Sequence, residues 1–406
     1  MSAGVARTFS FGSTTAVLEA SPYGQARAAG SSRILGSLRH GASPGASRTC
    51  RSVETNFPFA DDQLAFAFAV REVLAEHCPA TAVREASRAV RRDVRLPAWS
   101  QLADMGFFGM LVSEEHQGLG RGLAGSILAF EETGRAALPG PVVETAVVAP
   151  LLVEDGDLLL QLATGKLCVS ARLGDQVYAP DADLADLLIV ERDGRSRVFP
   201  AAGVRLTPQA GADPVRRLFS LAVGAEERTD HLAASGKARR STAVPALEAA
   251  TVAVAAQLVG LARHVLDVSA DHARSRRQFG MPVSAFQAIK GRLADVAVAI
   301  DLAAPVVYAA AAAVDRAGRG AVAPSGLDRA VSAAKATAGE AATRAAETAL
   351  RVYGAAGYAD ELDLRLWLAR VWSLASAYGD TGVHRARLRA AVLGNPALPS
   401  DLPWAL

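Results

Sequence analysis

A carboxylate near the C-terminus lies at a break in a helix-like pattern, in the stretch WSLASAYGDTGVHRARLR at residues 372–389. A carboxylate presented by a turn can act as a general base, so Asp380 is a candidate catalytic residue. Asp380 also precedes Thr381 and a helical run, which is the position of an N-cap, a far commoner role than catalysis. His384 can titrate near neutral pH, although a lone histidine is more often a surface or packing residue. The stretch therefore predicts either a general base or a helix cap.

A second group of polar residues lies in RSRRQFGMPVSAFQAIKGRLAD at residues 274–295. Paired guanidinium groups beside an open turn can bind a pyrophosphate, and Arg276 and Arg277 fit that description. Gln278 and Gln287 can hydrogen-bond to an adenosine moiety. A structural alternative is equally adequate, because cations at a helix C-terminus oppose the negative end of the helix dipole. The residue types alone leave both interpretations open.

The elements that must position these residues change in character along the chain. Helical periodicity runs from Asp61 to about residue 150, short apolar runs between turns fill residues 167–232, and long alanine-rich helical segments follow. The pattern predicts a mainly α protein with a small antiparallel β domain and a bundle of about four helices. Because β and α elements do not alternate, a Rossmann or TIM architecture is excluded. The predicted parts are a disordered or misassigned leader at 1–52, an N-terminal α domain at 53–150, a shortened β domain at 151–241 and the bundle at 242–406.

The first bundle helix is predicted over residues 245–276. Its polar residues Arg263, Asp267, Asp271 and Arg274 recur at helical spacing and form one narrow stripe on an otherwise apolar cylinder. A helix of this kind is buried on most sides. We therefore expect it to lie inside the bundle.

The composition excludes several classes of function. Among 406 residues, 43 Lys+Arg against 41 Asp+Glu leave a formal charge of +2, and aromatics make up 6%, so nothing favours a nucleic-acid partner. The three cysteines have no metal-ligand spacing, which favours a reducing cytoplasm and no metal site. No apolar run reaches the roughly 18 residues of a membrane span, and no phosphate-binding glycine motif is present.

Three stretches resemble motifs of the acyl-CoA dehydrogenase family. Residues 276–287 are similar to the family element R-x-x-F-G-x-P-x-x-x-F-Q, and WSQLADMGFFGMLVSEEHQGLG at residues 99–120 resembles its N-terminal element. RVYGAAGYADELDLRLWLARVWS at residues 351–373 resembles its Q-x-x-G-G-x-G-Y element. The matches keep their order from about Asp61 to the end of the chain. The resemblance implies the family fold, with an N-terminal α domain, a middle β barrel and a C-terminal four-helix bundle.

The resemblance also implies a reaction and its cofactor. Members remove two hydrogens from the α and β carbons of an acyl-CoA thioester, using a carboxylate base and FAD, and an electron-transfer flavoprotein is the expected electron acceptor. By transfer from the family motifs, Arg276, Gln278, Phe279 and Gln287 would hold the FAD phosphate and adenine. Gly354 and Gly357 would let the backbone approach the cofactor of a neighbouring subunit, although a turn between helices would explain both glycines as well.

The sequence departs from the family where the chemistry should occur. The family's T-E-x-x-x-G-S-D stretch has no recognisable equivalent in CVSARLGDQVYAP at residues 168–180, and Arg351 replaces the usual glutamine. The base position of most members falls on Tyr378, and the alternative base position on the first bundle helix falls on Ala250. A tyrosine with a pKa near 10 is a poor base at neutral pH. Asp380, two residues further on, could replace the glutamate only if the turn moved it inward.

A missing base and a short β domain resemble the shortened subunits of heteromeric actinobacterial members that degrade steroids. We therefore expect a flavin-dependent acyl-CoA dehydrogenase subunit whose site is completed by a paralogous subunit in a heterotetramer. One alternative is a self-sufficient homo-oligomer that uses Asp380 as the base. Another is a non-catalytic subunit that stabilises a partner enzyme.

Overall fold

The computed structural model describes residues 8–11, 14–17, 59–88, 97–192, 195–222, 246–321, 324–354, 357 and 362–393. The chain forms two compact units, residues 1–54 and residues 55–406. In the first unit, strands β1 (Thr8–Phe11) and β2 (Thr14–Val17) pair antiparallel, and the rest of the predicted leader lies outside the described residues. All other elements belong to the second unit.

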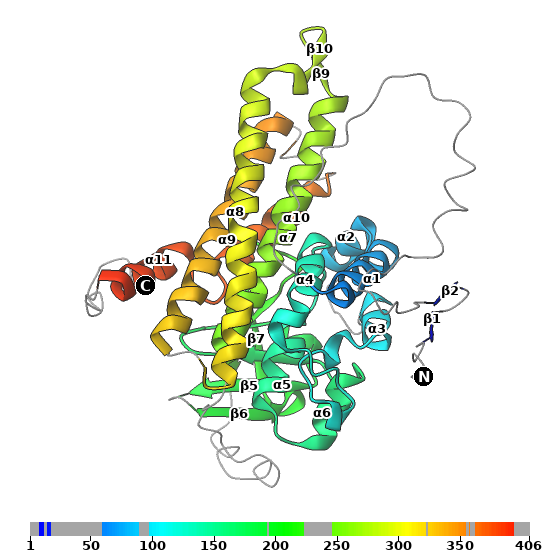
Figure 1. Ribbon diagram of the computed structural model, residues 1–406, viewed down its shortest axis with the longest axis vertical. Coiled ribbons are helices and arrows are strands. Elements are labelled where there is room, and N and C mark those ends of the chain that lie inside the picture. Colours follow the sequence, from blue (N-terminus) through cyan, green and yellow to red (C-terminus); the bar gives the residue numbers. More distant parts are fainter. Residues whose placement is uncertain are drawn as a thin grey trace, which may run out of the picture. The chain divides into compact units, whose positions relative to one another are not determined.

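The second unit begins with helices, as the sequence periodicity predicts (Figure 1). They are α1 (Asp61–His77), α2 (Ala80–Arg88), α3 (Pro97–Asp104), α4 (Gly122–Arg135), a π-helix (Glu144–Val148), α5 (Ala149–Leu152) and α6 (Gly156–Ala163). Helix α4 begins at a carboxylate from another helix, because Asp315 accepts hydrogen bonds from the N–H groups of Leu123 (2.8 Å) and Ala124 (2.9 Å). This carboxylate satisfies backbone donors that have no partner within α4.

The strands form two small sheets. One has the order β3 (Val169–Arg172), β5 (Leu187–Arg192), β6 (Arg195–Pro200). The other has the order β4 (Ala179–Pro180), β8 (Leu218–Ala222), β7 (Arg205–Gln209). The sequence predicts only antiparallel pairing, and this is wrong for β3 and β5, which run parallel. The chain leaves β3, contributes β4 to the other sheet and then returns, so β5 enters in the direction of β3.

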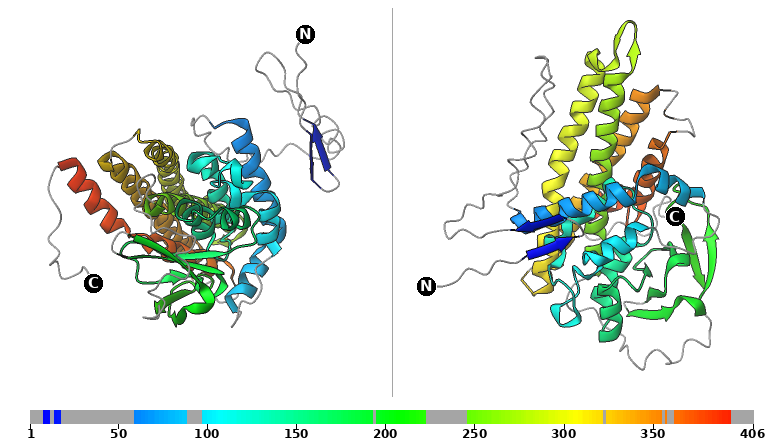
Figure 2. Two further views of the ribbon diagram at one scale, coloured as in Figure 1. Left: turned by 90° about the horizontal axis from the view of Figure 1, so that it is seen from below. Right: turned by 90° about the vertical axis from the view of Figure 1, so that its right-hand side faces the viewer.

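The remaining helices form the bundle, and they are α7 (Ala246–Ser275), α8 (Gln287–Gly318), α9 (Pro324–Tyr353), α10 (Leu364–Ser376) and α11 (Thr381–Leu393). Helix α7 lies within one residue of its predicted bounds at each end and is buried along most of its length. Short strands β9 (Arg277–Gln278) and β10 (Met281–Pro282) form a hairpin between α7 and α8. This hairpin projects from the end of the bundle remote from sheet strands β5 to β7 (Figures 1 and 2).

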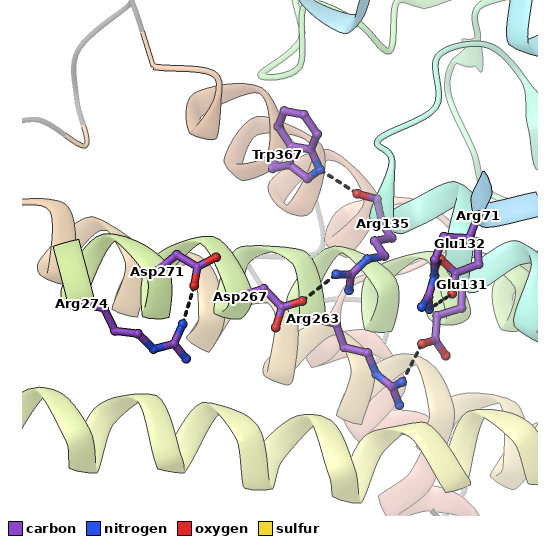
Figure 3. Close-up of polar contacts among 9 residues, drawn as sticks. All are labelled: Arg71, Glu131, Glu132, Arg135, Arg263, Asp267, Asp271, Arg274 and Trp367. Atoms are coloured by element: carbon purple, nitrogen blue, oxygen red, sulfur yellow. Dashed lines mark hydrogen bonds and ion pairs between the residues drawn. The ribbon is translucent and has the colours of Figure 1, made fainter. Parts of the chain in front are cut away.

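The polar stripe of α7 binds neighbouring helices, as Figure 3 shows. Arg263 pairs with Glu131 of α4 (3.0 Å), and Asp267 pairs with Arg135 at the end of α4 (2.6 Å). Nearer the hairpin, Arg274 pairs with Asp271 within α7. Two of the predicted stripe residues therefore fasten the first bundle helix to the N-terminal helices.

Helices α4 and α7 also touch through their backbones. A Cβ atom at Gly260 of α7 would lie 1.9 Å from the carbonyl oxygen of Glu131, and a Cβ atom at Gly134 of α4 would lie 2.1 Å from the carbonyl oxygen of Gln257. Real side-chain atoms do not approach a backbone oxygen so closely. Both positions therefore require glycine for the helices to cross at this distance.

Helices α7 and α8 are long and apolar enough to cross a membrane when judged by length and composition alone. This differs from the sequence expectation, which considered uninterrupted apolar runs and found them too short. In the most apolar 18-residue window, 83% of α7 and 50% of α8 is buried inside the protein. Burial of this extent is usual for α7 as the central helix of a bundle, because neighbouring helices cover its apolar residues.

Candidate active site

Asp380 lies in the turn between α10 and α11, where the sequence predicts either a base or a cap. Its Oδ1 atom accepts a hydrogen bond from the N–H of Val383 at 2.8 Å, and its side chain is exposed. This bond satisfies a donor in the first turn of α11 and is the geometry of an N-cap. The predicted cap is therefore present, whereas the role of Asp380 as a base stays a prediction.

The turn itself is held from α9 by a buried lysine. Lys335 is 1% exposed, and its Nζ atom donates to the carbonyl oxygens of Ala375 (2.8 Å) and Gly379 (2.9 Å). Burial lowers the pKa of Lys335 to about 7, an effect that Asp380 opposes and Arg216 reinforces. Lys335 thereby satisfies carbonyl groups at the C-terminal end of α10 and in the turn.

His384 binds the same turn from α11. Its Nε2 atom lies 3.0 Å from the carbonyl oxygen of Tyr378, and its Nδ1 atom lies 3.2 Å from the hydroxyl oxygen of Ser332 on α9. A carbonyl can only accept, so Nε2 carries the proton and Nδ1 accepts from Ser332. Burial lowers the pKa of His384 to about 4, which keeps the ring neutral. The candidate acid or base of the sequence is thus a packing residue.

Tyr378, at the base position implied by the resemblance, points into the protein and away from solvent. Its φ angle is +57°, which is uncommon for a residue other than glycine, and its hydroxyl donates to Oε1 of Glu144 at 2.7 Å. Both side chains are buried. Burial raises the pKa of Tyr378 well above its usual value, and the neighbouring Glu144 adds to this rise. Tyr378 therefore holds its proton at neutral pH.

Glu144 is a residue that the sequence reasoning missed. It begins the π-helix, and burial raises its pKa while the cation of Arg216 and the hydrogen bond from Tyr378 oppose the rise. The available signal was a single glutamate in the apolar run PVVETAVVAP, because glutamate is almost never fully buried without a partner. The partner lies 234 positions away along the chain, which no local pattern reports.

A cavity of about 470 Å³ lies beside this turn. Its lining includes Gln176 and Arg216 from the β region, Leu247 of α7, and Trp372 and Tyr378 at the end of α10. Residues 173–178, part of the stretch without a recognisable equivalent of the family's flavin-contacting motif, line the cavity together with residues 376–379 of the turn. The structure thus brings together two places where the sequence departs from the family. The cavity is of a size usual for small-molecule sites.

The predicted FAD-binding residues lie far from this cavity. Arg276, Gln278 and Phe279 lie at the β9–β10 hairpin, and Gln287 begins α8. All four are exposed, and Phe279 is 90% exposed with a φ angle of +51°. The structure thus places three of these residues at the projecting hairpin and the fourth at the start of the helix that follows it. Guanidinium and amide groups suit the pyrophosphate and adenine of a flavin, and the described residues of this chain leave these groups exposed.

The two predicted glycines differ in environment. Gly354 follows α9 with a φ angle of +62°, and a Cβ atom there would meet no atom within 4 Å. Gly357 is buried, and a Cβ atom there would lie 3.1 Å from the Cβ of Tyr353. The open backbone at Gly354 is compatible with close approach by a ligand or another chain.

Two regions of the chain match known protein families. Residues 60–158 match the family described as "Acyl-CoA dehydrogenase, N-terminal domain", and residues 241–393 match "Acyl-CoA dehydrogenase, C-terminal domain". The chain is 28% identical over 333 residues to acyl-CoA dehydrogenase IpdE2 of Mycobacterium tuberculosis, which covers 80% of this chain and 96% of that protein. It is 30% identical over 320 residues to acyl-CoA dehydrogenase FadE34 of the same species, which covers 73% of this chain and 42% of that protein.

Solved structures are similar over nearly their whole length. The ChsE4-ChsE5 complex from Mycobacterium tuberculosis gives a TM-score of 0.68 at 19% identity, covering 84% of this chain and 100% of the matched chain. The Tcur3481-Tcur3483 steroid ACAD gives a TM-score of 0.69 at 20% identity, covering 82% and 98%. At these identities the likeness shows the fold, which is the one that the motifs imply.

Proposed function

Because the chain belongs to the acyl-CoA dehydrogenase family, we propose that it is a subunit of a flavin-dependent enzyme that desaturates an acyl-CoA thioester. We propose further that a paralogous subunit completes its active site. In this arrangement the partner supplies the carboxylate base of the family, because Tyr378 occupies that position here. Bound flavin would accept a hydride from the β carbon and pass its electrons to an electron-transfer flavoprotein.

The distance between the β9–β10 hairpin and the cavity supports the proposal that a second subunit is needed. Leu247, which lines the cavity, is the second residue of α7, and the hairpin follows the last residue of that helix, Ser275. At about 1.5 Å per residue the two places are about 40 Å apart along the helix. One flavin cannot reach both places within one chain. The hairpin residues Arg276, Gln278 and Phe279 are therefore available to a flavin bound by another subunit.

The kind of acyl group is proposed from the relatives. One similar structure is described as a steroid ACAD, and another is a complex of two differently named chains. The first description supports a steroid-derived acyl-CoA for this chain, and the second supports a heteromeric assembly.

Expression of the chain alone and together with a paralogous acyl-CoA dehydrogenase subunit from the same genome tests the proposal. The flavin absorbance per chain, the mass of the assembly and acyl-CoA oxidation with a dye acceptor are measured for each preparation. For the chain alone we expect substoichiometric flavin and no acyl-CoA oxidation. For the complex we expect bound flavin and acyl-CoA oxidation. A single chain that holds one flavin and oxidises acyl-CoA without a partner refutes the proposal.

A further inference from the structure

Several uncommon features meet at Tyr378, which lines the 470 Å³ cavity, and at Glu144, which lies behind it. A π-helix begins at Glu144, and π-helical segments are rare and frequent at functional sites. Tyr378 adopts a left-handed backbone conformation that is costly for a large side chain. The hydroxyl of Tyr378 donates to the carboxylate of Glu144 at 2.7 Å, and Tyr378 lines the cavity. We refer to these two side chains as the Tyr378–Glu144 pair.

A purely structural role explains this pair poorly. Glu144 is 4% exposed, and a carboxylate removed from water destabilises the folded state unless its partners compensate. A leucine or glutamine would fill a similar volume at lower cost. Other interactions hold the strained turn in place. Lys335 donates a hydrogen bond to the carbonyl of Gly379, and His384 donates one to the carbonyl of Tyr378. A strained tyrosine at the cavity wall and a buried carboxyl hydrogen-bonded to its hydroxyl together indicate chemistry.

Glu144 is surrounded by a small set of structural elements and charged groups. The elements packed against its π-helix are α5, α7, β3 and the 3-10 helix Phe107–Gly109. Thr145 fastens the π-helix to β3, because its hydroxyl donates to the carbonyl of Val169 at 3.0 Å. The charged or titratable groups that act on Glu144 are Arg216 and Tyr378. Tyr378 is therefore the only one of these two that can carry a proton between Glu144 and the cavity.

We propose that the Tyr378–Glu144 pair is a proton acceptor in this chain's own cavity. The C–H bond at the α carbon of a bound acyl thioester breaks, and its proton goes to the oxygen of Tyr378. The hydroxyl proton of Tyr378 passes at the same time to Oε1 of Glu144. The electron pair stays on the substrate as an enolate, so atoms and charge balance.

This inference rests on the reaction of the proposed function but goes beyond it. The proposed function assigns the usual base to the partner subunit, whereas the pair gives this chain a second kind of proton acceptor. An assembly of both subunits would then contain two chemically different cavities. The two proposals can fail independently.

Hydrogen exchange at the α carbon tests the pair directly. A steroid side-chain acyl-CoA, the class named in the proposed function, and octanoyl-CoA are incubated in D2O with the complex, in which the partner's base carboxylate has been replaced by its amide. Deuterium at the α carbon is followed by mass spectrometry. We expect exchange above the solvent background, and a loss of at least about 100-fold in E144Q and in Y378F, as is usual when a general base is removed. E340Q removes a partly exposed carboxylate of α9 that pairs with Arg385, and should leave exchange unchanged.

The pH profile separates proton transfer from a structural effect. Exchange should rise with pH as Glu144 loses its proton, and E144D should keep a pH-dependent rise with a displaced midpoint. Y378F removes one hydroxyl and leaves the buried carboxyl in place, so it covers the case in which E144Q fails to fold. The inference is wrong if the unmodified complex shows no exchange, or if folded E144Q or Y378F exchanges as fast as the unmodified protein. If no complex forms, the partner proposal fails, and the same exchange assay on the chain alone still tests the pair.

Discussion

Replacement of the buried Lys335 by methionine should change how stability depends on pH. Methionine keeps a similar length and volume but removes the amine, which donates to the carbonyls of Ala375 and Gly379. The chain contains only four lysines. Few other amines therefore contribute to the pH dependence of stability. The lead experiment therefore compares K335M with the unmodified protein at several pH values.

The magnitude follows from the pKa of Lys335. The folded protein releases this proton near pH 7, whereas the unfolded chain keeps it up to a pKa of 10.5. The unfolded state therefore binds more protons between these values, and the free energy of unfolding rises with pH there. One pKa unit corresponds to about 1.4 kcal/mol, so the rise from about pH 7 to about pH 9 amounts to about 2 kcal/mol.

Urea unfolding followed by circular dichroism measures this rise. K335M should lack it, and near pH 9 it should also be less stable, since each carbonyl left without a donor costs about 1–3 kcal/mol. K290M removes an exposed lysine of α8 and should keep the full rise. Parallel curves for K335M and the unmodified protein would show that burial does not lower the pKa of this amine, and the account of the turn would then be wrong.

Two further substitutions test the turn and the helix crossing. D380A removes the acceptor for the N–H of Val383, so it should cost about 1 kcal/mol of stability in urea unfolding. It should leave acyl-CoA oxidation by the complex unchanged, and loss of turnover with flavin retained would instead make Asp380 the base. G260A places a Cβ atom 1.9 Å from the carbonyl oxygen of Glu131 and should cost about 3 kcal/mol or more. G291A, an exposed helical site with no atom within 4 Å, should be neutral or slightly stabilising, and equal effects of the two alanines would contradict the crossing.

Long periodic segments were predictable from the sequence. The helix predicted over residues 245–276 is observed as Ala246–Ser275. A helical apolar pattern sustained over about 30 residues is too long for a strand and therefore indicates a helix. The cap at Asp380 was also predictable, since capping depends on local chain geometry alone. Where local chemistry decides the structure, the sequence was sufficient.

Contacts between distant parts of the chain were not predictable. The parallel pairing of β3 and β5 depends on the path of the chain between them, and short apolar runs carry no sign of strand direction. The bond between Tyr378 and Glu144 depends on the packing of the π-helix against the bundle. Residues at such contacts serve a site that only the folded protein assembles, which is why the proposed proton acceptor was absent from the sequence interpretation.

The backbone contact between α4 and α7 bears on how this protein is divided. Helix α4 lies in the region matched by one family model, and α7 lies in the region matched by the other. At Gly134 and Gly260 no side chain separates the two regions, and the same compact unit contains both. The boundary between the two family matches therefore falls inside one compact unit, and at this crossing neither matched region has a complete surface of its own.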